Sequence, residues 1–442
     1  MGFSDSREVN LAQLQRFGVL PTKNKMTSSR LLLAAAACGA PLAATAFLLA
    51  RPTPQSARPW DAESSAPLTL AAREAGAAQP WAWEPLPDAE AVCLDGSQYG
   101  LVNCIGSGPI KTVYISIQGG GWCYDESDCL GRSFTALGSS SSWPAKAAGL
   151  SCTPQAGIAY VNMWYGDGAS FTGYRADAWP VPGNATAKLY FRGIKNLDAT
   201  LDYLFAKYAL AGAELLVVNG GSAGGLSTFL HLDHVAARMA AAGSSAVVRG
   251  QPVCGYFLDA GNDGSQPLNV TYPLRMKYVY TMQNSTGSLS TECQSVYGID
   301  AWKCIMAPHA AQFIKTPWFA LQSRTDTWQL GNIAMIPCTG NPLTCPAQQW
   351  AQIQAYSPQF MDQWLAIAEV PNSPNGAFLD ACLVHGSTSS TIDGLTNNEA
   401  FESWLNGGNK THGNWWTMKC DGSILTGPCD RGPSCEKFPP AS

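Results

Sequence analysis

Charged side chains are scarce in this chain, since Asp, Glu, Lys and Arg make up only 13% of its 442 residues. The formal net charge is −5, and residues 1–30 carry five basic and two acidic side chains, so the rest of the chain is more acidic, at −8. A hydrophobic share of 46% excludes a disordered composition, and the acidic balance argues against nucleic acid as a partner. We therefore expect a globular protein with no nucleic-acid partner.

Histidine is also scarce, with five in the chain, and no two cysteines have the C-x-x-C spacing of a zinc site. We expect no metal and no cofactor. Cysteine itself is plentiful: Cys38 lies in an apolar N-terminal run, and fourteen more lie between Cys93 and Cys435. This even number predicts up to seven disulfides formed in an oxidising compartment, with a connectivity that spacing leaves open.

The N-terminal region divides into three segments. Residues 1–30 are basic and precede residues 31–50, an uncharged run long enough to cross a bilayer at about 1.5 Å per residue. This pattern predicts either a type II signal anchor, with 1–30 in the cytosol, or a signal peptide cleaved near Ala46. Residues 51–90 are rich in Pro, Ala and Ser and read as a stem, and 91–442 form the body with a Cys-rich tail. The body carries N-glycosylation sequons at Asn184, Asn269, Asn284 and Asn409.

Residues 214–227 organise the body. A short Val-rich run, typical of a buried parallel strand, leads into Gly220-Gly-Ser-Ala-Gly224, which matches the G-x-S-x-G pattern of a nucleophile elbow. Residues 226–242 have the composition of the helix that such an elbow requires. The alternative is a glycine-rich turn that binds phosphate or nothing. The strand before and the helix after favour Ser222 as a nucleophile.

Apolar runs alternate with helical patterns through the rest of the body, which predicts a mostly parallel central sheet flanked by helices. Strands are expected at 111–118, 157–162, 253–259, 317–322 and 377–385, and helices at 189–207 and 361–369.

The glycines at 119–121 follow a predicted strand, and because they lack side chains their backbone N–H groups are accessible, as an oxyanion hole requires. A bridge between the nearby Cys123 and Cys129 would hold this loop rigid. A serine nucleophile also needs a histidine base and an acid, in the chain order serine, acid, histidine. His385 follows the last predicted strand and is the best-placed base, whereas Asp326, Asp259 and Asp380 all remain open as the acid.

Six motifs follow one another along the body: Ile117-Gln-Gly-Gly-Gly-Trp-Cys123, Asp167-Gly-Ala-Ser-Phe-Thr-Gly173, Leu189-Tyr-Phe-Arg-Gly193, Gly221-Ser-Ala-Gly-Gly225, Asp259-Ala-Gly261 and Asp326-Thr-Trp-Gln329. Together they are similar to those of plant pectin acetylesterases, and the animal carboxylesterase Notum belongs to the same wider family. The resemblance implies a disulfide-rich α/β-hydrolase fold with Ser222, Asp326 and His385 as the catalytic residues. It also implies an oxyanion hole formed by the backbone of Gly121, Trp122 and Ala223.

The chain departs from the plant pattern at Gly166 and Gly221, where plant members usually have cysteine. We expect a serine esterase that removes O-acetyl groups from a polysaccharide such as pectin through an acyl-enzyme on Ser222. The acidic body is unfavourable for such a polyanion unless a local basic patch, such as one around Arg324, compensates, so a neutral acetylated glycan stays open. Alternatives are a Notum-like deacylase of a lipidated protein or lipid ester, and a non-catalytic glycan-binding protein.

The expected location is the secretory pathway. An uncleaved anchor would place the body on the lumenal face of the Golgi or another organelle, with a single membrane span. A cleaved signal would release it to the cell wall or extracellular space. The acyl group, the disulfide connectivity and the oligomeric state are not fixed by the sequence.

Overall fold

The computed structural model describes residues 76–260, 271–338, 345–368, 373–386, 390–407 and 415–418. The segments predicted at 1–30 and 31–50, most of the stem and most of the Cys-rich tail lie outside these residues, as do Asn269 and Asn409. Within the described part, no helix is long and apolar enough to cross a membrane.

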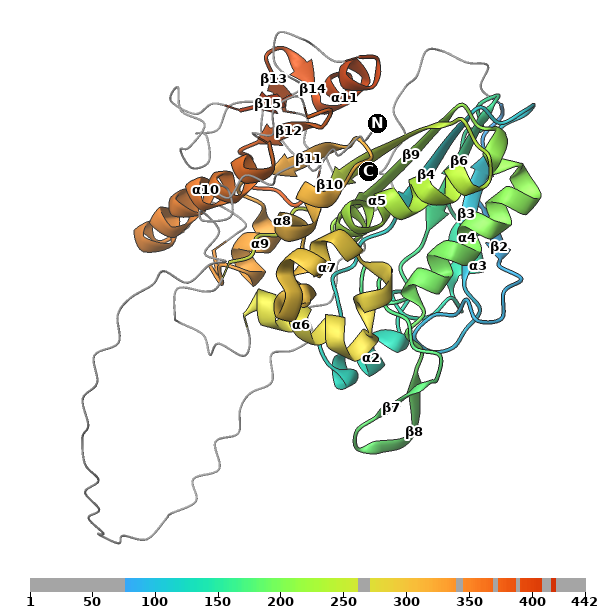
Figure 1. Cartoon of the computed structure of the whole chain (residues 1–442), viewed down its shortest axis with the longest axis horizontal. Coiled ribbons are helices and arrows are strands. Elements are labelled where there is room, and N and C mark those ends of the chain that lie inside the picture. The colour runs from blue at the N-terminus through green and yellow to red at the C-terminus, as the bar shows by residue number, and fades with distance from the viewer. Residues whose placement is uncertain are drawn as a thin grey trace, which may run out of the picture. The chain divides into compact units, whose positions relative to one another are not determined.

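A nine-stranded sheet forms the centre of the body, in the order β15-β12-β11-β10-β9-β4-β6-β3-β2 (Figure 1). Neighbours from β15 through β6 run parallel, whereas β3 is antiparallel to β6 and β2 is antiparallel to β3. The predicted mostly parallel sheet is thus confirmed. Its strands are β2 (Ala82–Pro85), β3 (Gly100–Ile105), β4 (Thr112–Ile117), β6 (Ile158–Met163), β9 (Leu215–Gly221), β10 (Val247–Val253), β11 (Phe319–Ser323), β12 (Gly376–Asp380) and β15 (Trp415–Thr417).

Among the described residues, three two-stranded sheets accompany the main one. They pair β1 (Gln79–Pro80) with β5 (Ser151–Cys152), β7 (Trp179–Val181) with β8 (Asn184–Leu189), and β13 (Thr391–Ile392) with β14 (Leu395–Thr396). Residues 79–85, which the sequence pattern places in the stem, therefore contribute strands, and β2 is an edge strand of the main sheet.

Alternate side chains of the central strands enter two separate hydrophobic clusters, because successive side chains of a strand point to opposite faces of its sheet. In β9, Leu216 and Val218 belong to the larger cluster and Val217 to the smaller one. In β4, Ile115 belongs to the larger cluster and Tyr114 to the smaller one. Both faces are buried, which explains why these strands read as continuous apolar runs.

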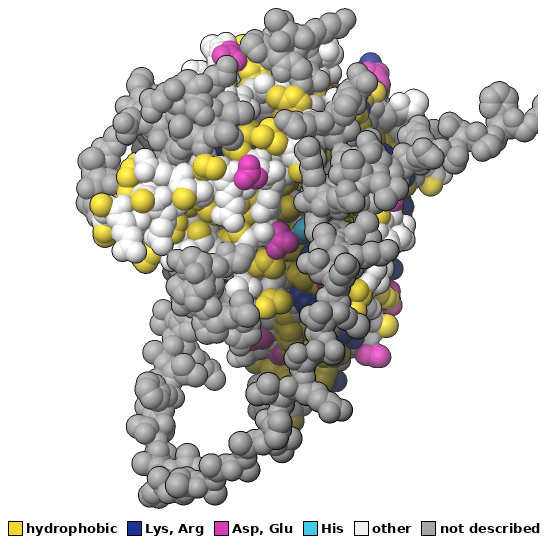
Figure 2. Space-filling view, turned by 60° about the vertical axis from the view of Figure 1, so that its left-hand side comes forward, with side chains coloured by type: hydrophobic (Ala, Val, Ile, Leu, Met, Phe, Trp, Pro, Cys, Tyr) yellow, Lys and Arg dark blue, Asp and Glu magenta, His cyan; other side chains and the backbone are white. Residues whose placement is uncertain are grey.

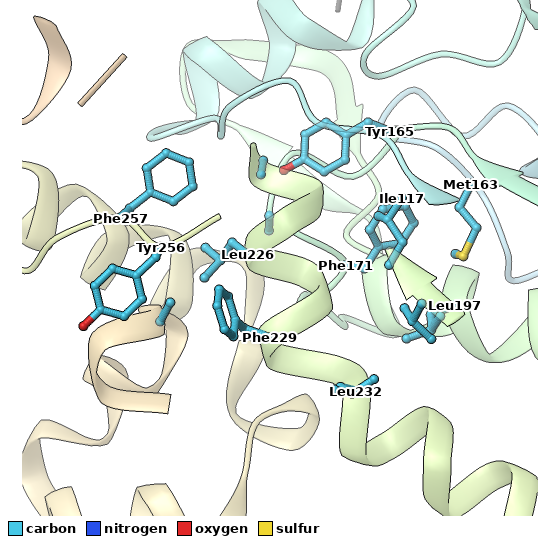
Figure 3. Close-up of a cluster of buried hydrophobic side chains, with 14 of the residues drawn as sticks. Ile117, Met163, Tyr165, Phe171, Leu197, Leu226, Phe229, Leu232, Tyr256 and Phe257 are labelled. Carbon is cyan, nitrogen blue, oxygen red and sulfur yellow. The ribbon is translucent and has the colours of Figure 1, made fainter. Parts of the chain in front are cut away.

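Helices cover these faces (Figure 1). Helix α5 runs through the larger cluster, where its Leu226 and Phe229 lie between Ile117 on one side and Tyr256 and Phe257 on the other (Figure 3). The helices are α2 (Glu126–Ser133), α3 (Trp143–Ala148), α4 (Gly193–Tyr208), α5 (Ala223–Ala241), α6 (Tyr272–Gln283), α7 (Thr291–Tyr297), α8 (Ala307–Ala310), α9 (Thr327–Asn332), α10 (Ala347–Ala368) and α11 (Asn397–Leu405), with 3-10 turns between some of them.

Disulfides link several segments of the body. Cys382 is disulfide-bonded, whereas Cys93 and Cys254 are buried free thiols, so the fourteen body cysteines do not all pair. Four bonds have both partners among the described residues: Cys104–Cys152, Cys123–Cys129, Cys293–Cys304 and Cys338–Cys345.

One expected strand is wrong. The sequence predicts a strand over 253–259, but β10 ends at Val253, where that strand was expected to begin. The following residues run as a buried irregular segment. Glutamine side chains supply its hydrogen bonds: the N–H groups of Tyr256 and Leu258 donate to Gln322 Oε1 and Gln329 Oε1, both at 3.1 Å. Because these polar groups are satisfied without a strand partner, the apolar run need not be a strand.

Candidate active site

Ser222 stands at a sharp turn between β9 and α5. Its φ and ψ are 58° and −124°, which place a non-glycine residue in a strained backbone conformation. The flanking glycines are needed for close approach: a Cβ on Gly220 would lie 2.3 Å from the carbonyl oxygen of Gly224, and a Cβ on Gly224 would lie 2.0 Å from that of Ile117. The geometry is that of a nucleophile elbow.

His385 and Asp326 meet Ser222 in a continuous chain of hydrogen bonds. His385 Nε2 lies 2.8 Å from Ser222 Oγ, and His385 Nδ1 lies 2.7 Å from Asp326 Oδ2. An ionised carboxylate only accepts, so Nδ1 carries the proton toward Asp326 and Nε2 accepts from the serine hydroxyl. Asp326 is fully buried, and its Oδ1 caps α9 by accepting the Gln329 N–H at 3.0 Å. The structure therefore brings together all three residues that the resemblance implies.

The two other candidate acids lie in different contacts. Asp259 Oδ2 pairs with His309 Nε2 at 2.7 Å. Asp380 Oδ1 accepts the N–H of Cys382 at 3.0 Å, and the charge of Asp380 acts on Arg324. Placement along the strands could not separate these carboxylates, whereas three-dimensional contact does.

Arg324 does not form a basic patch at the surface. This side chain is fully buried, and burial lowers the pKa of its guanidinium to about 10, with the Asp380 charge opposing that shift. A buried guanidinium offers no surface to a polyanion, and no local pattern in the sequence indicates that Arg324 is buried.

The loop after β4 lies directly against the elbow. A Cβ on Gly119 would lie 2.3 Å from the carbonyl oxygen of Gly221 and 2.8 Å from Ser222 Cβ. Within the described ranges, no acceptor is found for the backbone N–H groups of Gly121, Trp122 and Ala223. They are therefore free to donate to an oxyanion formed beside Ser222.

Two features hold this loop in shape. The predicted bridge between Cys123 and Cys129 is present. The guanidinium of Arg132, on α2, donates to the carbonyl oxygens of Gly120 at 2.9 Å and Trp122 at 3.1 Å. The Gly120 carbonyl shares its peptide plane with the Gly121 N–H, so this contact fixes that donor. The Trp122 carbonyl shares its plane with the Cys123 N–H, which donates to the Gly168 carbonyl oxygen at 3.1 Å. Sequence reasoning missed Arg132, because nothing in the chain marks its contact with the loop.

Aromatic rings pack around the histidine. The ring of His385 lies 6.2 Å from those of both Phe257 and Trp328. Trp122 in turn packs against Phe257 at 4.9 Å and against Tyr272 and Trp328 at 5.6 Å. Figure 2 shows a face on which hydrophobic side chains (yellow) gather, with an acidic side chain (magenta) and a histidine (cyan) beside them. Among the described residues, no group of His, Cys, Asp and Glu side chains is arranged to hold a metal ion.

An elbow serine hydrogen-bonded to a histidine and a buried aspartate, at the carboxyl ends of strands in a mostly parallel sheet, defines an α/β hydrolase. Residues 83–421 match the family model described as pectinacetylesterase, so the chain belongs to that family. Members of the family and its relatives hydrolyse carboxylic esters, and this chain is a carboxylic ester hydrolase.

Individual relatives agree with this assignment. Pectin acetylesterase 11 of Arabidopsis thaliana is 31% identical over 329 residues, covering 69% of this chain and 79% of the relative. Palmitoleoyl-protein carboxylesterase notum2 of Xenopus laevis is 28% identical over 305 residues, covering 66% of this chain and 59% of the relative. The structure of the Wnt deacylase Notum from Drosophila matches with a TM-score of 0.65 at 21% identity, covering 81% of this chain and 100% of that one. This last likeness concerns the fold.

Proposed function

We propose that the chain is a serine esterase that removes O-acetyl groups from a polysaccharide, with Ser222, His385 and Asp326 as its catalytic triad. The observation that carries the mechanism is the hydrogen-bonded chain from Ser222 Oγ through His385 to the buried Asp326. A serine hydroxyl is a weak nucleophile unless a base takes its proton, and the carboxylate stabilises the imidazolium that results.

The reaction proceeds in two half-reactions. Ser222 Oγ bonds to the acetyl carbon while its proton passes to His385 Nε2, and the carbonyl oxygen becomes an oxyanion that accepts from the N–H groups of Gly121, Trp122 and Ala223. The bond from carbon to the sugar oxygen then breaks, and the proton on Nε2 goes to the leaving sugar hydroxyl. A water molecule attacks the acyl-enzyme, gives its proton to Nε2, and acetate leaves as Ser222 recovers that proton.

The close packing of aromatic rings beside His385 supports a short acyl group. The rings of Trp122, Phe257, Tyr272 and Trp328 lie in mutual contact, with centroids 4.9–6.1 Å apart. Rings at this spacing leave no room between them for a long acyl chain. The pectin acetylesterase relatives also support an acetylated polysaccharide as substrate.

The test compares wild type with Ser222→Ala on acetylated pectin, acetylated xylan, and nitrophenyl esters of increasing acyl length. We expect acetate release from at least one glycan, fastest cleavage of the shortest ester, and loss of nearly all activity in the variant. Unchanged cleavage by Ser222→Ala would refute the mechanism. Preference for long acyl chains, with no acetate from either glycan, would instead favour a Notum-like deacylase.

We also propose that the protein matures in the secretory pathway and stays there as a type II membrane protein anchored by residues 31–50. Its disulfides support an oxidising compartment. Asn184 is exposed where β8 begins, and Asn284 is exposed with its amide donating to the Tyr174 carbonyl at 3.1 Å, so both can be reached by a glycosylating enzyme. Release of the full-length protein from membranes by alkaline carbonate would contradict the anchor, and an unchanged mass after glycosidase treatment would contradict glycosylation.

A further inference from the structure

Ser170 connects the two parts of the chain that supply the proposed oxyanion donors. Its hydroxyl accepts a hydrogen bond from Trp122 Nε1, in the loop after β4, at 2.8 Å. The same hydroxyl donates to the carbonyl oxygen of Ala223, the first residue of α5, also at 2.8 Å. One fully buried oxygen thus joins the Trp122 side chain to the elbow.

The backbone of Ser170 is strained and held from several directions. Ser170 and Phe171 have φ angles of 54° and 60°, in the left-handed region that residues with a Cβ seldom adopt. The Asp167 carboxylate keeps this turn in place by accepting the N–H groups of Ala169 at 3.2 Å and Phe171 at 2.8 Å. The N–H of Ser170 donates to the Tyr165 hydroxyl at 2.8 Å.

The elbow helix holds the same residue from the other side. His231 Nε2 lies 2.9 Å from the carbonyl oxygen of Ser170. Burial lowers the pKa of His231 to about 4, so the ring is neutral at ordinary pH, and its Nε2 proton donates to that carbonyl. Strain maintained by so many contacts is typical of a position that serves a site.

We propose that Ser170 is a positioning residue for ester hydrolysis, which sets the distance between the Trp122 donor and the Ala223 donor of the oxyanion hole. The inference rests on the proposed function. The hydroxyl touches no reacting atom, but it fixes two segments that are 101 residues apart in sequence. Donors on separate segments stabilise an oxyanion only if their spacing is set before the charge develops.

The first test removes the hydroxyl while keeping the Cβ, in Ser170→Ala. We expect kcat on a short nitrophenyl ester to fall by about 10- to 100-fold, the size of effect that a small misplacement of catalytic groups produces, with KM changed by less than about twofold. The matched control is Thr172→Val. Thr172 is buried in the same turn, and within the described part of the chain its Oγ1 hydrogen-bonds to Ala169 O and Ser285 Oγ and not to the elbow. The control should be destabilised while keeping its kcat.

A second variant separates positioning from folding. Trp122→Phe removes the indole donor and leaves Ser170 intact, so if the two groups act as one unit, the double variant should lose little more kcat than either single variant. All rates are taken per active site titrated with a fluorophosphonate. Additive losses, an unchanged kcat in Ser170→Ala, or equal losses in Ser170→Ala and Thr172→Val would each overturn the proposal. If Ser222→Ala is inactive while Ser170→Ala is normal, only this inference fails, whereas activity in Ser222→Ala refutes the proposed function itself.

Discussion

At the scale of single residues, Asp167 is a fully buried carboxyl group whose protonation differs between the folded and the unfolded chain. Burial raises the pKa of this carboxyl to about 7, although the backbone N–H groups of Phe171, Ala169 and Asp167 and the nearby Arg132 charge act against that shift. In the folded chain the group therefore binds a proton up to about pH 7, whereas in the unfolded chain it loses that proton near pH 4.

The expected consequence is a fall in the free energy of unfolding as pH rises from about 4 to about 7, because the native state binds more protons in that window. Asp167→Asn should remove this contribution, so the stability of the variant relative to wild type should improve between about pH 5 and about pH 8. Urea denaturation of both proteins at the two pH values measures this difference in the free energy of unfolding. The control is Asp88→Asn: the pKa of Asp88 is lowered, because the Glu90 N–H and Lys195 outweigh its partial burial. The Asp88 carboxyl is ionised at both pH values. The free energy of unfolding of Asp88→Asn should therefore differ from that of wild type by the same amount at each pH.

Cys93 gives a second prediction at this scale. A Cβ on Gly166 would lie 2.7 Å from Cys93 Sγ and 3.4 Å from its Cβ, close to the spacing of about 3.5–4.5 Å between disulfide Cβ atoms. Gly166→Cys should therefore form a disulfide with this free thiol and raise the free energy of unfolding by about 2–4 kcal/mol under oxidising conditions. Thiol titration of the denatured protein should find one free thiol fewer than in wild type. Gly166→Ala crowds Cys93 without a bond and should lower stability; a stabilised alanine variant would contradict this account.

At the scale of elements, α2 matters because Arg132 lets it hold the glycine loop after β4. Lysine at position 132 keeps the charge, but a single ammonium cannot reproduce the fork that spans two carbonyl oxygens. We expect Arg132→Lys to lower kcat about tenfold with little change in KM, measured on a short ester. Arg175 likewise donates to two backbone carbonyls, those of Thr281 and Met282, away from the loop, so Arg175→Lys is the matched control. Equal losses in both variants would mean that Arg132 has only a general structural role.

Elements with strong local patterns could be predicted from sequence, and others could not. The strands β4, β6 and β9 and the helix α5 carry continuous apolar or helical patterns and lie close to their expected positions. The segment after Val253 is equally apolar, yet its backbone bonds to glutamine side chains from elsewhere in the chain. Such long-range partners leave no local trace, so periodicity alone predicted a strand there.

The candidate site shows the same division between local and distant signals. Ser222 was evident from a five-residue motif, and His385 from its place after the last predicted strand. Asp326 was separated from its rivals only by resemblance, and the structure supports that choice through contact with His385. The sequence did not indicate that Ser170 and Arg132 hydrogen-bond to the glycine loop after β4, because these partners lie on different segments of the chain. A motif had included Ser170, but its role depends on two contacts that only the folded chain brings together.

At the scale of the whole molecule, charge distinguishes an anionic from a neutral substrate. The chain beyond residue 30 carries −8, and the buried Arg324 offers no compensating patch. A polyanion such as pectin should therefore be repelled at long range, and this repulsion weakens as salt shortens the screening length to about 10 Å at 0.1 M. We expect kcat/KM for acetylated pectin to rise between low and moderate ionic strength, while that for neutral acetylated xylan stays constant.

Acetate release from each glycan over a series of salt concentrations measures this difference, and a nitrophenyl ester controls for salt effects on the catalytic step. A kcat/KM for pectin that falls with salt would contradict the repulsion and indicate a local cationic surface near the site. Arg275 is the residue to substitute in that event. Its guanidinium stacks on the Tyr124 ring at 5.2 Å, two residues beyond Trp122, and is only half-buried. Net charge acts over the whole surface, but one cation beside the oxyanion loop acts at close range, so the sign of the salt dependence shows which of the two governs substrate binding.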